Sequence, residues 1–149
     1  MSIFPKKLKI LPADDVTDER LFFRKALQEL PVDFHLTTVN NGDGLMVFLN
    51  NDLTELPDVL FLDINLPLKS GTECLEELKQ NPKPENLPLI MFSTLNSACA
   101  IKMLFNKGAD VYIHKPNEFA KLKQVIYHAL PISKDINFAA TQIKYILNA

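Results

Sequence analysis

The chain of 149 residues contains no tryptophan, four glycines and two cysteines, and its formal net charge is only -2. Cys74 and Cys99 fit neither a metal knuckle nor a disulfide framework, and each lies among apolar residues, so we expect two buried thiols. The near balance of 16 basic and 18 acidic residues gives no electrostatic reason to expect nucleic acid or an anionic membrane as a partner. Neither a Walker loop nor a GxGxxG motif occurs, which leaves nucleotide binding without support.

Long hydrophobic runs are also missing. The N-terminal segment MSIFPKKLKILPADD has a short apolar run that Pro12 interrupts, so it predicts neither a signal peptide nor a membrane span. A cytoplasmic location follows as the default. With 47% hydrophobic and 23% charged residues, the composition is that of a globular protein and not of a disordered chain. The length suits one domain with a single core.

What the chain does contain is an alternation of short apolar runs with amphipathic segments. The apolar runs predict strands at about 8–13, 35–39, 58–64, 89–94 and 110–115. The amphipathic segments predict helices at about 18–30, 45–53, 72–80, 97–107 and 117–130. Strict alternation predicts an α/β fold, a parallel sheet with helices on both faces, because parallel strands need a crossover between them.

An acidic residue follows the most apolar of these runs. In PDVLFLDINLPLKSG, residues 57–71, the run Val59 to Leu62 is typical of a strand covered on both faces, and Asp63 comes directly after it. Polar chemistry in an open parallel sheet gathers outside the carboxyl ends of the strands. Other predicted strands also end in polar side chains, namely Asp14, Asp15, Ser93, Thr94 and Lys115. We therefore expect these side chains to meet at one edge of the sheet.

Three carboxylates at one edge repel each other, and an apolar floor makes their ionisation costlier. A hard divalent cation relieves this repulsion, and Mg²⁺ prefers such oxygen ligands. A lysine can pair with a carboxylate or with a phosphoryl oxygen. The combination of carboxylate, metal, ammonium and hydroxyl is suited to holding a phosphoryl group on Asp63. A lone acid at this position would be interpreted as a strand-end cap, but an unpaired buried charge is costly.

Four motifs, in this order and at these spacings, make the chain resemble a known family. They are ADD at 13–15, LFLDINLPLKSG at 60–71, LIMFST at 89–94 and VYIHKP at 111–116. From about residue 8 to 130 the chain resembles the receiver domain of bacterial two-component response regulators. Its local sequence is similar to that of the stand-alone receivers encoded beside bacterial phytochromes. The resemblance implies a flavodoxin-like, doubly wound (βα)5 fold with a five-stranded parallel sheet in the order 2-1-3-4-5.

The resemblance also implies a function, that of a single-domain response regulator and not of an enzyme. Asp63 would accept a phosphoryl group from a sensor histidine kinase, and Ser93 and Lys115 would contact that group. Phosphorylation would shift the population of conformations and change the affinity of one face for a downstream protein, whose identity the sequence leaves open.

Further roles carried by the resemblance concern the metal and the conformational switch. Mg²⁺ would be bound by Asp14, Asp15, Asp63 and the backbone carbonyl of Asn65. The switch would consist of Ser93 and Tyr112, and Pro116 would follow a cis peptide bond. Taken alone, Ser93 could be an ordinary strand-end hydroxyl, and Tyr112 is almost as well explained as a core residue.

Two other classes of protein fit the sequence less well. A phosphatase of the haloacid dehalogenase type also uses an aspartyl nucleophile, but it requires a second acid two residues later, where this chain has Asn65. A degenerate receiver, which binds partners without being phosphorylated, would lack one of the acids or the lysine, and this chain keeps all of them.

We expect residues 1–130 to form the receiver domain and residues 131–149 to form a C-terminal extension, too short for an output domain. In this extension Phe138, Ile143, Ile146 and Leu147 could form the apolar stripe of an added helix. Such a helix would pack back on the domain, with a homodimer interface as the alternative. Output would then come through protein contacts.

Overall fold

A computed structural model describes residues 7–51, 55–80, 87–133 and 145–147. Strands and helices alternate along the chain, as the sequence predicts. The elements are β1 (Leu8–Ala13), α1 (Thr17–Gln28), β2 (Phe34–Leu36), α2 (Gly42–Asn50), β3 (Val59–Leu62), α3 (Gly71–Gln80), β4 (Leu89–Ser93), α4 (Ala98–Asn106), β5 (Val111–His114), α5 (Phe119–Ser133) and β6 (Tyr145–Leu147).

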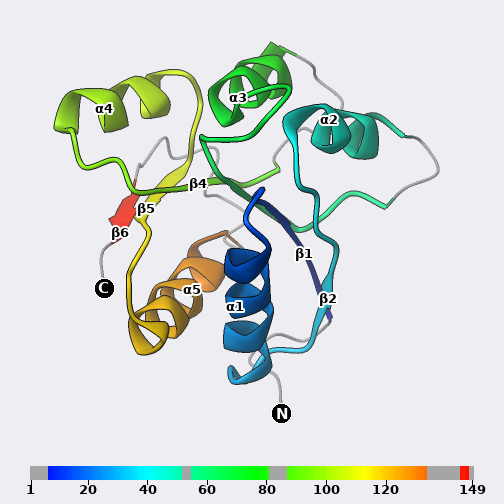
Figure 1. Cartoon of the computed structure of the whole chain (residues 1–149), viewed down its shortest axis with the longest axis vertical. Coiled ribbons are helices and arrows are strands. Elements are labelled where there is room, and N and C mark those ends of the chain that lie inside the picture. The colour runs from blue at the N-terminus through cyan, green and yellow to red at the C-terminus, as the bar shows by residue number, and fades with distance from the viewer. Residues whose placement is uncertain (1–6, 52–54, 81–86, 134–144, 148–149) are drawn as a thin grey trace.

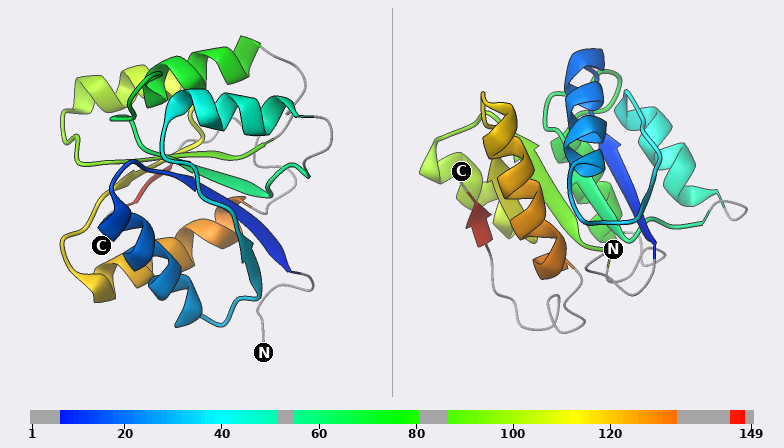
Figure 2. Two further views of the ribbon diagram at one scale, coloured as in Figure 1. Left: turned by 45° about the vertical axis from the view of Figure 1, so that its right-hand side comes forward. Right: turned by 90° about the horizontal axis from the view of Figure 1, so that it is seen from below.

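The strands form one parallel sheet in the order β2-β1-β3-β4-β5-β6. The expected order 2-1-3-4-5 is therefore confirmed, with β6 added at one edge. Helices α1 and α5 cover one face of the sheet, and α2, α3 and α4 cover the other (Figures 1 and 2). This is the doubly wound arrangement that the alternating pattern predicts.

The apolar core lies in two layers, one on each face of the sheet. Strand β3 contributes to both, because Val59 and Phe61 belong to the layer under α1 and α5, and Leu60 and Leu62 belong to the other. All four side chains are at most 1% exposed. Each fully buried side chain of this size stabilises the fold by about 1.5–3 kcal/mol. The missing alternation in this run thus reflects a strand that is covered on both faces.

Pro12 lies inside β1 and limits its pairing with β2. Its carbonyl accepts a hydrogen bond from Val39 N–H at 3.2 Å, so the proline faces the β2 side of the strand. It has no N–H to donate to that neighbour. Strand β2 ends at Leu36, and the pairing resumes only as a bridge between Ala13 and Val39. The predicted strand over 35–39 is shortened for this reason.

The C-terminal extension contains a strand where the sequence predicted a helix. Residues Tyr145–Leu147 form β6, which pairs in parallel with Val111–Ile113 of β5 (Figure 1). The helical prediction is wrong for this segment, whereas Phe138 and Ile143 lie outside the described residues. An edge strand presents unpaired N–H and C=O groups, and β6 satisfies those of β5. Helix α5 also continues past its predicted end at Leu130 and includes Pro131.

The two cysteines differ in burial. Cys74 is fully buried on the inner face of α3, as expected, but Cys99 is exposed on α4. The buried residues of α4 are Ile101 and Leu104, and Cys99 lies two positions before the first of them, on the opposite side of the helix. The expectation of a buried thiol is therefore wrong for Cys99.

Candidate functional site

Three parallel strands deliver an acid, a second acid and a lysine to one edge of the sheet. Asp14 follows β1, Asp63 follows β3 and Lys115 follows β5. The Asp63 N–H donates to the Ala13 carbonyl at 3.1 Å, and the Lys115 N–H donates to the Ser93 carbonyl at 2.8 Å. Backbone hydrogen bonds between neighbouring strands therefore fix the acid and the lysine where they are. The expected convergence at the carboxyl ends of the strands is found for Asp14, Asp63 and Lys115.

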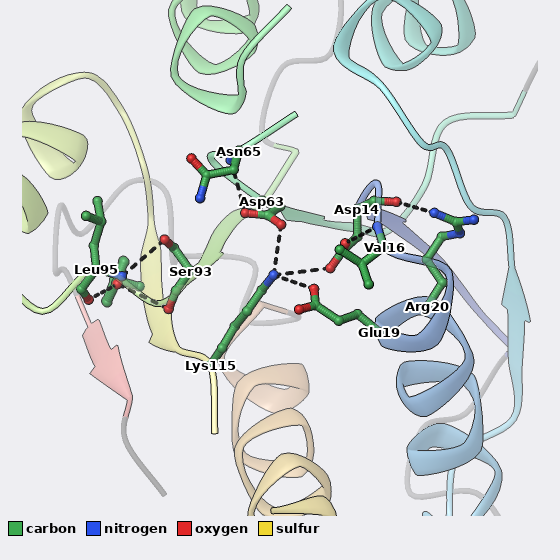
Figure 3. Close-up of polar contacts among 10 residues, drawn as sticks. Asp14, Val16, Glu19, Arg20, Asp63, Asn65, Ser93, Leu95 and Lys115 are labelled. Carbon is green, nitrogen blue, oxygen red and sulfur yellow. Dashed lines mark hydrogen bonds and ion pairs between the residues drawn. The ribbon is translucent and has the colours of Figure 1, made fainter. Parts of the chain in front are cut away.

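The Lys115 ammonium is the centre of this site (Figure 3). It donates to Asp63 Oδ2 at 2.8 Å, to Glu19 Oε2 at 2.7 Å and to Asp14 Oδ2 at 3.2 Å. It also lies 5.5 Å from the centroid of the Phe92 ring, a cation–π distance. The side chains of Asp63, Asp14 and Lys115 are 6%, 8% and 12% exposed, respectively. This network is thus largely shielded from water.

Glu19 is a member of the cluster that the sequence reasoning missed. Within the described part of the chain, carboxylate oxygens of Asp14, Glu19 and Asp63 all lie within 4.8 Å of one another. Glu19 lies in the first turn of α1, where an acid is usually explained by the helix dipole. The sequence contains one indication of this role. Glu19 lies about one helical turn after Asp14 and Asp15, and side chains on a helix point back toward its N-terminus.

Burial and proximity alter the proton affinities of these groups. Burial, followed by a hydrogen bond with Glu19, raises the pKa of Asp14 to about 7. The same hydrogen bond with Asp14, together with that from Lys115, lowers the pKa of Glu19. Burial alone would lower the pKa of Lys115, but its hydrogen bonds to Asp63 and Glu19 outweigh that effect and raise it. The cluster holds more negative charge than one ammonium neutralises.

The loop after β3 closes directly on Asp63. The Asn65 N–H donates to Asp63 Oδ1 at 3.1 Å, and the Gly71 N–H donates to the Ile64 carbonyl at 2.8 Å. A Cβ atom at Gly71 would lie 2.0 Å from the Asp63 carbonyl oxygen, so only glycine fits. Leu68 in this loop has a φ of 69° and is 77% exposed, a conformation uncommon for a bulky residue.

Asp14 is held by its own chain, whereas Asp15 is not part of the cluster. The Val16 N–H donates to Asp14 Oδ1 at 2.9 Å, and the Arg20 guanidinium donates to the Asp14 carbonyl at 2.6 Å. Asp15 is exposed, and its carboxylate is not among the three that approach one another. The metal-binding roles of Asp14, Asp15, Asp63 and Asn65 stay predictions.

The two expected switch residues, Ser93 and Tyr112, meet at the start of the β4–α4 loop. Ser93 is fully buried, and its Oγ accepts a hydrogen bond from the Leu95 N–H at 3.2 Å. The Tyr112 hydroxyl donates to the Leu95 carbonyl, and at 3.3 Å to the Ser93 carbonyl. Tyr112 is 1% exposed, and this burial raises its pKa. Both side chains therefore contact the same exposed loop.

The peptide bond before Pro116 differs from the expectation. Within the described ranges there is no cis peptide bond, so the Lys115–Pro116 bond is trans. The trans form is intrinsically favoured for X–Pro bonds by about 0.5–1 kcal/mol.

No helix in the described part of the chain is long and apolar enough to cross a membrane.

Comparisons with known proteins agree with this geometry. The response regulator receiver domain family matches residues 10–127. Response regulator Rcp1 of Synechocystis is 27% identical over 126 residues, which are 82% of this chain and 85% of Rcp1. The Mn²⁺-bound form of Rcp1 superposes with a TM-score of 0.73 at 24% identity, covering 81% of this chain and 90% of that one. The phosphorylated cyanobacterial phytochrome response regulator RcpA gives a TM-score of 0.79 at 25% identity, covering 87% and 96%.

Proposed function

Because the chain belongs to the response regulator receiver domain family, we propose that it accepts a phosphoryl group on Asp63 from a sensor histidine kinase and signals through altered contacts with another protein. The observation that carries this proposal is the contact between Asp63 Oδ2 and the Lys115 ammonium, 2.8 Å apart at the carboxyl edge of the sheet. A nearly buried carboxylate in contact with a fixed cation is suited to nucleophilic attack on phosphorus.

The proposed transfer uses groups already in place. An Asp63 carboxylate oxygen forms a bond to phosphorus while the bond between phosphorus and the donor's leaving atom breaks. The Asn65 N–H holds Oδ1 of the carboxylate at 3.1 Å and so orients it. Lys115 neutralises charge on the phosphoryl oxygens as the bond forms. Transfer thus depends on positioning and charge compensation, as is usual for phosphoryl groups.

We include Mg²⁺ in this proposal, bound by Asp14, Asp15, Asp63 and the backbone carbonyl of Asn65. The chemistry fits, since two of these donors, Asp14 and Asp63, belong to the cluster of carboxylates whose oxygens lie within 4.8 Å of one another, and Mg²⁺ prefers oxygen ligands. Burial, followed by the hydrogen bond with Glu19, raises the pKa of Asp14, so a bound cation would favour its ionised form. When bound, the metal supplies charge neutralisation at the phosphoryl oxygens. Rcp1 itself has a Mn²⁺-bound form.

Addition of Mg²⁺ should therefore stabilise the protein. A ligand that binds only the folded state stabilises it by mass action, and ten times its dissociation constant gives about 1.4 kcal/mol. We expect a rise of about 4 °C in melting temperature, measured by differential scanning fluorimetry. NaCl at equal ionic strength serves as the control for screening. A shift of equal size in an Asp15→Asn/Asp63→Asn double variant would place the metal elsewhere.

The proposed output is a change at the face formed by α4, β5 and α5. Support comes from the hydrogen bonds that join Ser93 and Tyr112 to the backbone of Leu95. If Ser93 turns to a phosphoryl group on Asp63, it gives up the Leu95 N–H and frees the loop that leads into α4. The same proposal has three further parts. The altered face contacts a downstream protein, formation of a homodimer is one form of output, and the protein is located in the cytoplasm.

Beryllofluoride, a stable mimic of the phosphoryl group, gives the direct test. With Mg²⁺ present it should bind to wild-type protein with one equivalent per chain and raise the melting temperature further. Asp63→Asn should abolish this binding, because the amide cannot supply the anionic oxygen. Failure of the wild type to bind, or undiminished binding by Asp63→Asn, would overturn the proposed function.

A further inference from the structure

Glu19 joins the reactive cluster without a part in the reaction proposed above. It lies in the first turn of α1, and its Oε2 accepts a hydrogen bond from the Lys115 ammonium at 2.7 Å. This contact is as close as the 2.8 Å contact between the same ammonium and Asp63. Figure 3 shows the ammonium between the two carboxylates. The lysine is therefore shared between the proposed phosphorylation site and helix α1.

The hydrogen-bonding capacity of Lys115 is fully used in this arrangement. An ammonium has three N–H donors, and Lys115 donates to Asp14, Glu19 and Asp63. A phosphoryl oxygen on Asp63 would also need a donor from Lys115, so an existing hydrogen bond must be released. The lysine has little room to move, since its side chain is 12% exposed and its ammonium lies over the Phe92 ring.

Glu19 is the partner that can leave most easily. Its side chain is 40% exposed, so its carboxylate can turn into water and be solvated there. Asp14 and Asp63 are each less than a tenth exposed. Both also accept a hydrogen bond from a backbone N–H, which keeps them in place. Release of Glu19 therefore costs less than release of either aspartate.

We propose that Glu19 is a positioning residue that holds the Lys115 ammonium in the unphosphorylated protein and competes with the phosphoryl group for it. This inference rests on the proposed phosphorylation of Asp63. Two effects act in the same direction. The Glu19 carboxylate occupies a donor that the phosphoryl group needs, and its negative charge repels the phosphoryl oxygens at short range. Glu19 thus favours the resting state over the phosphorylated one.

Titration calorimetry with beryllofluoride at saturating Mg²⁺ tests this role. Glu19→Gln keeps the size of the side chain and removes its charge. We expect this variant to bind beryllofluoride about fivefold more tightly than wild type, the change that corresponds to a partly exposed ion pair. A variant with a damaged fold would bind more weakly, so tighter binding cannot come from structural damage.

Asp18→Asn is the matched control. Asp18 is exposed in the same first turn of α1, so the change removes the same charge from the same helix end. Its effect on affinity should stay below about twofold, because exposed charges are screened. In NMR spectra of protein with ¹⁵N-labelled lysine, the ammonium signal of Lys115 should shift from its wild-type position in Glu19→Gln. It should keep that position in Asp18→Asn.

The outcomes distinguish a failure of the proposed role of Glu19 from a failure of the proposed phosphorylation of Asp63. Unchanged or weaker affinity in Glu19→Gln, or equal tightening in both variants, would overturn the role of Glu19. An unmoved Lys115 signal in Glu19→Gln would do the same. If the wild type binds no beryllofluoride, the proposed function fails first, and the competition fails with it.

Discussion

Replacing Lys115 with methionine should lower the free energy of unfolding by about 3 kcal/mol at pH 8. Methionine keeps most of the aliphatic volume beside Phe92 but removes the cation. The carboxylates of Asp14 and Asp63, each less than a tenth exposed, are then left without their counter-charge. Removing one partner of a buried ion pair lowers stability for this reason. Urea denaturation followed by circular dichroism measures the loss.

The size of this loss should depend on pH. In the folded protein the pKa of Asp14 is raised from 3.8 to about 7. The folded state therefore binds a proton more tightly than the unfolded state, and stability falls as pH rises through this window. Without Lys115 the pKa of Asp14 should rise further. At pH 5.5 Asp14 is protonated in the folded variant, so we expect about half of the loss seen at pH 8.

Lys123→Met provides a matched control. Lys123 also lies over a phenylalanine ring, 5.6 Å from the centroid of Phe119, and pairs with Glu29 at 3.1 Å. Its side chain is 32% exposed and that of Glu29 is 46% exposed, so the same substitution should cost less than about 1 kcal/mol. Equal losses in the two variants, or a loss in Lys115→Met that is the same at both pH values, would contradict the electrostatic account of the site.

Asp63→Asn should eliminate phosphoryl acceptance altogether. The amide lacks the anionic oxygen that attacks phosphorus, so incubation with acetyl phosphate and Mg²⁺ should leave the intact mass of the variant unchanged. The fold should persist, because the amide oxygen can still accept the hydrogen bond from the Asn65 N–H. Circular dichroism and the melting temperature verify that the variant is folded.

The control for this change is again Asp18→Asn, in which an exposed acid of the neighbouring helix is neutralised. This variant should gain mass in the same reaction. Phosphorylation of Asp63→Asn to the wild-type extent would show that another residue is the acceptor.

The parts of the site that the sequence predicts are those indicated by short runs of consecutive residues and by the polar residues that follow them. Four apolar residues with no alternation predicted that β3 is covered on both faces, and the acid that follows them predicted where polar chemistry lies. The strand-end rule then brought Asp14 and Lys115 to the same edge, although 101 positions separate them. Periodicity and sheet topology are sufficient for this inference because they do not depend on individual side-chain contacts.

The features that sequence reasoning missed depend on distant partners. Glu19 has the usual place of a first-turn helix acid, and its contact with Lys115 spans 96 positions. Strand β6 has three residues, too few for a period of two to be recognised, and it pairs with the edge of β5. Its segment carries apolar residues that also suit a helix, and the open edge of the sheet decides between the two.

The location of the phosphoryl group tests the central claim most directly. Wild-type protein is incubated with acetyl phosphate and Mg²⁺, its intact mass is recorded, and the protein is digested with pepsin at low pH for peptide mapping. One added phosphoryl group, on Asp63 in the segment that follows β3 and absent when EDTA replaces Mg²⁺, is the result that this account predicts. No gain in mass, or a phosphoryl group on any other residue, would contradict it.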